Sequence, residues 1–239
     1  MKFVSTIPNI AFYSKKGGVG KTTLSFHGAD AFAMKGYNTA LLDLDPQGST
    51  TTLSELNDKA LESGETTEKG FLFDSYADSK EMGALQASPK QWSHIIDSLA
   101  KAGHDLVVAE YGPGIPGAAL GKRHDLVVVP MQPCQTDYIA ALHGVQSLPK
   151  DVPVIAVLNR YKASSPSHQL FYTMAQEAFG ADNVLLVQEA TVFQTCNNLG
   201  RSVYTLTERP YGLAKAKGSM DLLVESILGR LGLPLDKTN

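Results

Sequence analysis

The stretch AFYSKKGGVGKTTLS, residues 11–25, decides the fold, because a short apolar run enters a glycine-rich loop that opens a helical pattern. Gly17, Gly18 and Gly20 allow backbone conformations and a close ligand approach that a Cβ atom would obstruct. Their N–H groups can converge on phosphate oxygens at the helix N-terminus. A strand, a glycine loop and then a lysine and a threonine together predict a phosphate-binding loop rather than an ordinary turn.

The end of the loop supplies the charged and hydroxyl groups that a nucleotide site needs. Lys21 places a positive charge near the β- and γ-phosphates, and the hydroxyl of Thr22 is suited to Mg²⁺. The nucleotide-binding candidates in this loop are Gly17, Gly18, Val19, Gly20, Lys21, Thr22 and Thr23.

Length and composition limit the classes of protein to consider. The 239 residues are 43% hydrophobic and 19% charged, which suits a single domain over residues 1–239 with a full core. The net charge of −3 means that any nucleic-acid binding would use a local patch. Cys134 and Cys196 have no metal-like spacing, so we expect the reducing cytoplasm. No run approaches the ~20 apolar residues that span a bilayer.

Short apolar runs alternate with helical patterns along the chain, which is typical of a mostly parallel sheet with helices on both faces. We therefore expect the three-layer α/β fold of P-loop NTPases. We predict strands over 9–14, 39–45, 105–110, 125–130, 152–159 and 183–187. We predict helices over 22–35, 89–102, 137–148, 167–179 and 220–231, with Gly36 and Gly180 ending two of them.

Residues 54–81 depart from this alternation. They hold eight acidic residues against three lysines, and their periodicity is weak. We interpret the segment as a solvated surface insertion within the single domain, rather than as a second domain.

Acidic side chains follow two of the predicted strands. LLDLDPQGST places Asp43 and Asp45 at the carboxyl end of a strand, where the ligands of open α/β sheets gather. Alternation along a strand puts both side chains on one face. DLVVAEYGPGIPG ends a later strand with Glu110. Capping or turn aspartates are the structural alternative for the first pair.

The loop departs from the common pattern G-x-x-x-x-G-K-[ST], because Lys15 stands at its first glycine position and Lys16 follows. KGGVGKT resembles the deviant Walker A loop of the ParA/MinD family of ATPases. In that family the early lysine, here Lys16, reaches across a nucleotide-sandwich dimer to the partner's phosphates. The resemblance implies an ATP-dependent homodimer in which Lys16 and Lys21 are both catalytic. A second cation at the β–γ bridge stabilises the charge that develops in phosphoryl transfer. Lys15 is interpreted as a solvated neighbour.

The carboxylates resemble the same family. DLDPQ, residues 43–47, is similar to its second motif, DxDPQ. By that resemblance Asp43 lies near Mg²⁺ and its waters, and Asp45 is a catalytic residue that positions or activates the attacking water. The segment around Glu110 resembles a Walker B region, in which the family usually has aspartate. Glutamate can still hold a magnesium-bound water. We therefore expect ATP and Mg²⁺ as cofactors, slow hydrolysis, and metal contacts from Thr22, Asp43 and Glu110, the carboxylates through water.

Two later segments resemble the surroundings of the adenine in this family. VIAVLNRY ends a strand at Asn159, where the family commonly contacts the base, although a strand-end turn asparagine is the alternative. FQTCNNLGRSVY resembles the family's late helix, and the loop around Pro210 would flank the base. The similarity extends from Asn9 to about Leu231 and leaves the acidic segment unmatched.

The C-terminal third distinguishes the branches of the family. Residues 220–239, MDLLVESILGRLGLPLDKTN, contain only Arg230 and Lys237 as cations against three acids. This is a poor match to the basic membrane-targeting helix of MinD-like members, so we expect no membrane partner. ParA-like members bind DNA without sequence preference through basic residues in this region. A solvated basic face is the alternative. The DNA-binding candidates are Arg201, Arg209, Lys215 and Lys217.

The sequence therefore predicts a ParA-like ATPase. ATP and Mg²⁺ would close a homodimer that binds nonspecific DNA of the nucleoid, and an activating adaptor, ParB-like or carried by the cargo, would stimulate hydrolysis. The expected outcome is the partition or positioning of a plasmid or chromosome. A related ATPase that positions a protein assembly or a conjugative DNA-transfer complex is one alternative, and a MinD-like membrane ATPase is another. A nitrogenase-reductase relative is disfavoured, because neither cysteine lies in the expected switch loop.

Overall fold

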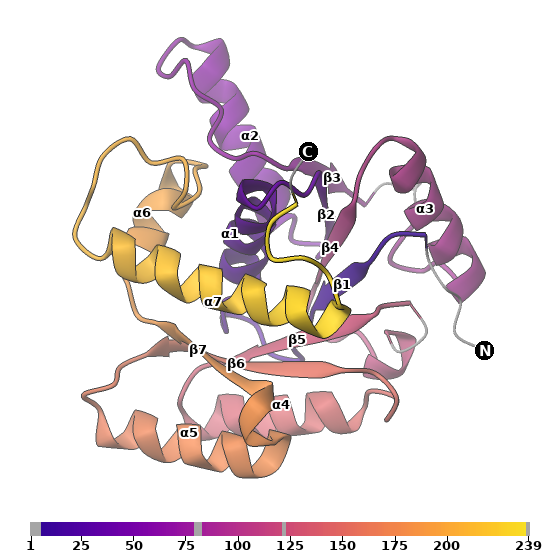
Figure 1. The fold of residues 1–239 in the computed structure, drawn as a ribbon, viewed down its shortest axis with the longest axis vertical. Helices are drawn as coiled ribbons and strands as arrows, with labels where there is room; N and C mark the ends of the chain where they lie inside the picture. Colours follow the sequence, from indigo (N-terminus) through magenta and orange to yellow (C-terminus); the bar gives the residue numbers. More distant parts are fainter. Residues whose placement is uncertain (1–5, 79–82, 121–122, 238–239) are drawn as a thin grey trace.

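The computed structural model describes residues 6–78, 83–120 and 123–237. Within these residues, seven parallel strands form one sheet in the order β3-β2-β4-β1-β5-β6-β7 (Figure 1). The strands are β1 (Asn9–Phe12), β2 (Thr39–Leu44), β3 (Asp74–Ala77), β4 (Leu106–Tyr111), β5 (Leu126–Met131), β6 (Val154–Tyr161) and β7 (Val184–Gln188). The α-helices are α1 (Lys21–Met34), α2 (Ser49–Glu62), α3 (Pro89–Lys101), α4 (Gln135–Gln146), α5 (Pro166–Phe179), α6 (Val192–Asn198) and α7 (Leu213–Leu231).

Helices cover both faces of the sheet, so its central strands are buried along their whole length. In β4, Leu106 and Val108 pack with α1 and α7, whereas Val107 and Ala109 pack with α3 on the opposite face. Helices α4 and α5 lie on the same face as α3 (Figure 1). Continuous apolar strands such as β4 and β5 are what a sheet covered on both sides requires. The expected three-layer α/β fold is confirmed.

The strand order places the glycine loop beside the acidic strand ends. Strand β1 pairs with β4 and β5, and β4 pairs with β2. In this register Glu110 lies opposite Phe12 on one side and opposite Asp43 on the other. Because all strands are parallel, the loop after β1 and the carboxylates of β2 and β4 emerge at the same edge of the sheet, where ligands of such folds bind.

The last helix is longer than its sequence pattern predicted. Helix α7 begins at Leu213, seven residues before the expected start, after Gly212 with φ 87°. Lys215, Lys217 and a glycine hide the periodicity of this first part, yet Leu213 and Ala216 are buried and continue the apolar face. None of the helices in the described part of the chain is long and apolar enough to cross a membrane.

The segment 54–81, expected as a solvated insertion, instead contributes a helix, a strand and part of the core. Helix α2 continues to Glu62, and β3 extends the sheet by pairing with β2. Phe71 and Phe73 are buried with their ring centroids 4.7 Å apart. The acidic residues favour solvation, but the apolar positions between them are enough to attach the segment to α1. Residues 79–81 lie outside the described part.

Asp30 on α1 ties this segment to a later loop. Its carboxylate accepts hydrogen bonds from the backbone N–H of Leu72, at 2.5 Å, and from the hydroxyl of Ser202. Burial raises the pKa of Asp30 from 3.8 to about 6, against the lowering effect of both bonds. The charged form is therefore disfavoured in the folded protein.

We expect Asp30→Asn to remove a pH-dependent loss of stability. Because the folded-state pKa lies above the unfolded value, the contribution of Asp30 is complete below pH 3.8 and is lost as the pH rises through about 6. A shift of this size corresponds to about 3 kcal/mol. Urea unfolding of wild type and Asp30→Asn across this pH range measures the difference in their free energies of unfolding. The contributions of the other titrating groups cancel in this difference. An equal pH dependence in wild type and variant would contradict the prediction.

Candidate nucleotide and magnesium site

The glycine loop adopts a conformation that side chains would prevent. Gly18 has φ 77° and Gly20 has φ 102°, in the region that L-residues rarely adopt. An ideal Cβ atom on Gly20 would lie 2.0 Å from Nδ2 of Asn159, whereas one on Gly17 or Gly18 would meet no atom within 4 Å. The loop thus packs closely against Asn159 at Gly20, and the space around Gly17 and Gly18 is open. This leaves room for a phosphate group above the N-terminus of α1.

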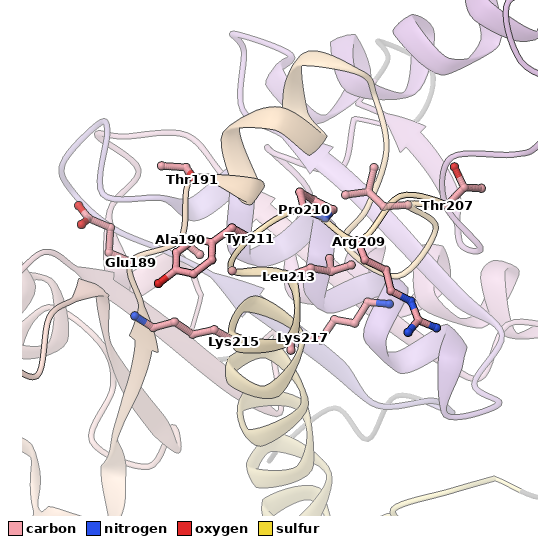
Figure 2. Close-up of a pocket in the computed structure, with 13 residues that line it drawn as sticks. Glu189, Ala190, Thr191, Thr207, Arg209, Pro210, Tyr211, Leu213, Lys215 and Lys217 are labelled. Carbon is pink, nitrogen blue, oxygen red and sulfur yellow. The ribbon is translucent and has the colours of Figure 1, made fainter.

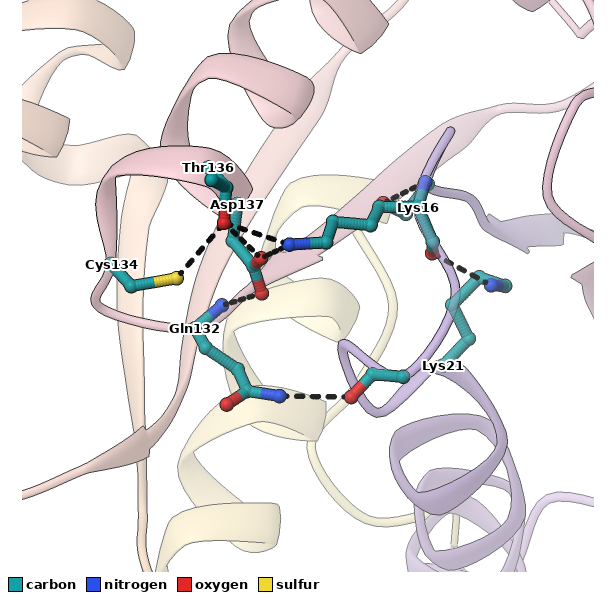
Figure 3. Close-up of polar contacts among 8 residues, drawn as sticks. Lys16, Lys21, Gln132, Cys134, Thr136 and Asp137 are labelled. Carbon is teal, nitrogen blue, oxygen red and sulfur yellow. Dashed lines mark hydrogen bonds and ion pairs between the residues drawn. The ribbon is translucent and has the colours of Figure 1, made fainter.

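Two amide side chains from neighbouring strands hold the loop in place. Nε2 of Gln132, after β5, donates to the carbonyl of Gly18 at 2.9 Å (Figure 3). Nδ2 of Asn159, at the end of β6, donates to the carbonyl of Val19 at 3.0 Å. Both carbonyls are thereby engaged by the protein, so that the N–H groups of the loop stay available for an anion.

Asn159 is buried, and its described contacts are with the protein itself. Its Oδ1 accepts from the backbone N–H of Arg160 at 2.9 Å, within β6 at a bulge where Arg160 has φ 56°. Pro210 lines two cavities, and Asn159 lines neither of them. Their contact with adenine stays a prediction.

The two lysines of the loop point to different places (Figure 3). Lys21 is buried, and its Nζ donates to the carbonyl of Lys16 at 3.3 Å. Burial lowers the pKa of Lys21, and nearby Glu110 and Asp45 oppose this effect. The side chain of Lys16 instead extends away from Lys21, across to the N-terminal turn of α4. Lys15 is exposed.

Asp137 on α4 holds Lys16 in this position. Nζ of Lys16 forms an ion pair with Asp137 and donates to Oγ1 of Thr136 at 2.8 Å. Burial by itself raises the pKa of Asp137, but the bonds from Lys16 and from the backbone N–H of Gln132 outweigh it, and the net pKa is lowered. The bond to Asp137 raises the pKa of Lys16. Both groups are therefore charged at neutral pH, and the ion pair holds the Lys16 side chain at the N-terminal turn of α4.

We expect Asp137→Asn to strengthen ATP-dependent dimerisation, because it releases Lys16 while keeping an oxygen for the N–H of Gln132. Lys16 is 41% exposed, and solvent screens the ion pairs of exposed side chains, so the effect should be small. The dissociation constant of the dimer should fall by about 2- to 5-fold, as measured by analytical ultracentrifugation with ATP and Mg²⁺. A weaker dimer would place Asp137 in the dimer contact itself.

Glu110 lies under the loop and is fully buried. Its Oε1 accepts from the hydroxyl of Thr22, and its Oε2 accepts from Ser25, at 3.0 Å, and from Thr50. Burial raises the pKa of Glu110, whereas the bonds from Thr22 and Thr50 lower it. Three hydroxyl donors offset part of the burial of this carboxylate, which reaches further than the aspartate usual in the family, and its net pKa stays raised.

Asp43 and Asp45 lie beside Glu110, at the end of β2. Oδ2 of Asp43 accepts from both the N–H and the hydroxyl of Thr51, at 2.8 and 2.9 Å. Oδ1 of Asp45 accepts from the N–H of Gln47 at 3.0 Å. Among the described residues no hydrogen bond to Oδ2 of Asp45 is formed, which leaves one carboxylate oxygen of a half-buried side chain free for a ligand.

The oxygen ligands fit Mg²⁺. A hydroxyl that donates its proton to a carboxylate, as Thr22 does to Glu110, keeps lone pairs for a cation. Asp43 and Glu110 are neighbours across the sheet, and Mg²⁺ is typically held by one or two carboxylates, phosphates and water. ATP would supply the phosphoryl group, and Mg²⁺ would neutralise the charge that develops on it. The chain itself supplies the phosphate cradle, the cation of Lys21 and the free oxygen of Asp45.

Sequence reasoning missed Gln132, Asp137, Ser25, Thr50 and Thr51 as parts of the site. The run of hydroxyl residues after Gly48, STTT, was the one available signal. This run forms the first turn of α2, where the hydroxyl of Thr50 donates to Glu110 and the hydroxyl of Thr51 donates to Asp43.

A second region of interest lies between the end of β7 and the start of α7. A cavity of about 900 Å³ is lined there by residues 189–191, 206–207, 209–215 and 217 (Figure 2). Arg209, Lys215 and Lys217 all border it, and Arg209 and Lys215 are exposed. Neither of these two forms an ion pair with a described residue. Nζ of Lys217 lies 5.7 Å from the ring centroid of Tyr204.

Arg201 is not part of this basic surface, contrary to the expectation from the sequence. Its side chain is 14% exposed, and its guanidinium donates to the hydroxyl of Thr66 and, at 3.5 Å, to the carbonyl of Thr205. Glu68 lies 4.0 Å away. The residues that neutralise Arg201 belong to the segment 54–81, whose packing the sequence pattern did not predict.

Comparison with known proteins agrees with this geometry. The model of the CobQ/CobB/MinD/ParA nucleotide binding domain matches residues 10–194. No curated protein sequence matches the chain significantly. Among solved structures, a plasmid partition protein of Borrelia burgdorferi bound to AMPPNP is similar, with 15% identity, a TM-score of 0.68 and coverage of 94% of this chain and 100% of that one.

Two further structures show the same fold. A variant of Cyanothece McdA in complex with ATP has 12% identity, a TM-score of 0.67 and coverage of 99% of this chain and 100% of the other. The septum site-determining protein MinD of Pyrococcus horikoshii, complexed with Mg-ADP, has 16% identity, a TM-score of 0.64 and coverage of 94% and 99%.

Proposed function

The chain belongs to the CobQ/CobB/MinD/ParA nucleotide-binding family and is an ATPase that uses ATP and Mg²⁺, and we propose that it acts as a ParA-type switch. In the ATP state two copies form a sandwich dimer that binds DNA without sequence preference. Hydrolysis, stimulated by an adaptor protein, dissociates the dimer and releases the DNA. The cycle positions or partitions a DNA cargo, a plasmid or chromosome, on the nucleoid in the cytoplasm.

The position of Lys16 carries this proposal. Its ammonium group is held outside its own phosphate loop, against Thr136 and Asp137 of α4, whereas Lys21 is buried within the loop. A lysine with this placement is suited to the nucleotide of a second copy. The dimer therefore completes each site with a cation that the single chain keeps elsewhere. Slow hydrolysis before dimerisation follows from the same arrangement.

The basic surface supports the choice of DNA. Arg209, Lys215 and Lys217 supply three positive charges in nine residues without an intervening acid, in a chain with a net charge of −3. Doubled in a dimer, they would neutralise about six phosphates, which corresponds to a slope of about −5 in log K against log salt. One copy alone has half of this charge, so dimerisation converts the nucleotide state into DNA affinity.

Binding to unrelated duplex DNA tests the proposal, with ATP–Mg²⁺, ADP–Mg²⁺ or no nucleotide, over a salt series. Binding restricted to ATP, weakened steeply by salt and by Arg209→Ala, supports it. Lys90→Ala, which removes an exposed charge from α3 on the opposite face, is the matched control and should have no effect. If ATP-dependent dimers formed but bound DNA in no nucleotide state, the proposed DNA binding and DNA cargo would be wrong. This outcome would favour a related ATPase that positions a protein assembly or acts at a membrane.

A further inference from the structure

Tyr211 stands out on the surface, because its side chain is 98% exposed. Other exposed large apolar side chains in the described residues, such as Leu222 at 64%, keep part of their area covered. A tyrosine ring with no covering contact gains nothing in stability from the folded state. Single exposed apolar residues are common on proteins, so the surroundings of Tyr211 decide whether it has a role.

The backbone holds Tyr211 in a defined position. The carbonyl of Pro210 accepts from the N–H of Leu213 at 3.1 Å, and Gly212 has φ 87° and ψ −4°. These values are those of a type II turn in which Tyr211 is the first corner residue. Leu213 is buried and anchors the turn to the core. The ring is therefore presented on a rigid support, which lowers the entropy lost when a ligand is bound.

The charges around Tyr211 are suited to a polyanion. Arg209 precedes it by two residues, and Lys215 extends below it along the cavity wall (Figure 2). Glu189 is an acid on the same wall, but Lys162 neutralises it in an ion pair of 2.7 Å. An exposed aromatic ring between free cations is the combination with which proteins bind nucleic-acid backbones and stack on bases.

We infer that Tyr211 stacks on an unpaired base, so that the basic surface prefers single-stranded DNA to duplex. The inference rests on the proposed DNA binding and specifies its substrate class. In a duplex the bases are already stacked on each other and offer the ring no free face. In a single strand every base has one, so the contact needs no particular sequence. Arg209, Lys215 and Lys217 hold the phosphates on either side.

The test uses the full chain with ATP–Mg²⁺ and two labelled probes, a short unstructured oligonucleotide and its duplex. Tyr211→Ala should weaken binding to the single strand by about 10-fold and leave duplex binding unchanged, with an unaltered salt slope. Tyr211→Phe should restore the wild-type value, because the ring is kept. Leu222→Ala, an exposed apolar residue on α7, is the matched control and should change neither probe.

The outcomes separate this inference from the proposed function. If wild type and Tyr211→Ala bound the single strand equally well, and the duplex equally well, the stacking would be wrong and nonspecific DNA binding would stand. An absence of binding to either probe would overturn the proposed DNA binding, and the inference with it. ATP affinity is measured in parallel, because Pro210, beside Tyr211, is a candidate for the base of ATP. A 10-fold loss of ATP affinity in Tyr211→Ala would assign the ring to the nucleotide instead.

Discussion

Replacing Lys16 with alanine is expected to abolish ATP-dependent dimerisation and to lower ATP hydrolysis by about 10³-fold, the range that a cation supplied in trans contributes to phosphoryl transfer. The affinity of the single chain for ATP should stay within about 3-fold of wild type, because the loop glycines and Lys21 remain. In the structure Nζ of Lys16 contacts Thr136 and Asp137 and forms no hydrogen bond with a described group of its own phosphate loop.

Lys15→Ala is the matched control for this experiment. Lys15 is adjacent to Lys16, exposed and equally charged. Its replacement therefore changes the net charge and the long-range attraction of ATP as much as Lys16→Ala does. Dimerisation is measured by analytical ultracentrifugation, hydrolysis by phosphate release, and nucleotide affinity with a fluorescent ATP analogue. If Lys16→Ala formed dimers and hydrolysed ATP like Lys15→Ala, the trans role of Lys16 would be wrong. A loss of ATP affinity without other change would instead place Lys16 at its own nucleotide.

Most of the fold could be predicted because its signals are local. Each of the six predicted strands is found within about two residues of its expected ends, since apolar runs flanked by turn residues specify strands without reference to the rest of the chain. Strand β3 and the helix before it were missed for the opposite reason. DSYA is partly exposed at the edge of the sheet, and its place depends on Phe71 and Phe73, which pack against α1.

The site residues likewise fall into those that local motifs predict and those that depend on contacts between distant parts of the chain. The glycine loop, Lys21, Asp43 and Asp45 are contiguous motifs, and the structure brings them to one edge of the sheet as expected. Asp137 lies 121 residues from the lysine it binds, and Gln132 lies 114 residues from the loop carbonyl it holds. No local pattern joins such pairs. Arg201 was wrongly included for the same reason. Its charge is evident in the sequence, but its contact with Thr66, 135 residues away, is not.

The substitution at Glu110 shows how a departure from a family pattern is accommodated. A glutamate extends further from β4 than an aspartate would, and it is met by Thr22, Ser25 and Thr50. Thr22 comes from the first turn of α1 and Thr50 from the first turn of α2, so the longer side chain connects both helices to the strand. The sequence left open whether Glu110 reduces activity. Its complete hydrogen bonding is what a retained carboxylate needs in a buried site.

Asp45→Ala is expected to lower ATP hydrolysis by about 10²- to 10⁴-fold, the range for a side chain that positions or deprotonates the attacking water. Asp45 keeps one carboxylate oxygen free of hydrogen bonds among the described residues, unlike Asp43 and Glu110, whose oxygens all accept bonds. It also lies close to the loop after β4, since an ideal Cβ on Gly112 would be 2.9 Å from its Oδ1. A free acceptor in this place is available for water.

The same substitution should leave ATP-dependent dimerisation intact, which distinguishes it from Lys16→Ala. Asp45 forms no hydrogen bond or ion pair with Lys16 or Lys21 in the described part of the chain, so its loss should trap the ATP-bound dimer. Gln47→Ala is the control, because Gln47 bonds to Asp45 only through its backbone N–H, which alanine keeps. Dimers that persist with ATP and barely release phosphate assign Asp45 to the chemical step. Normal turnover by Asp45→Ala excludes it from catalysis, and a variant that fails to dimerise shows instead that Asp45 shapes the strand end.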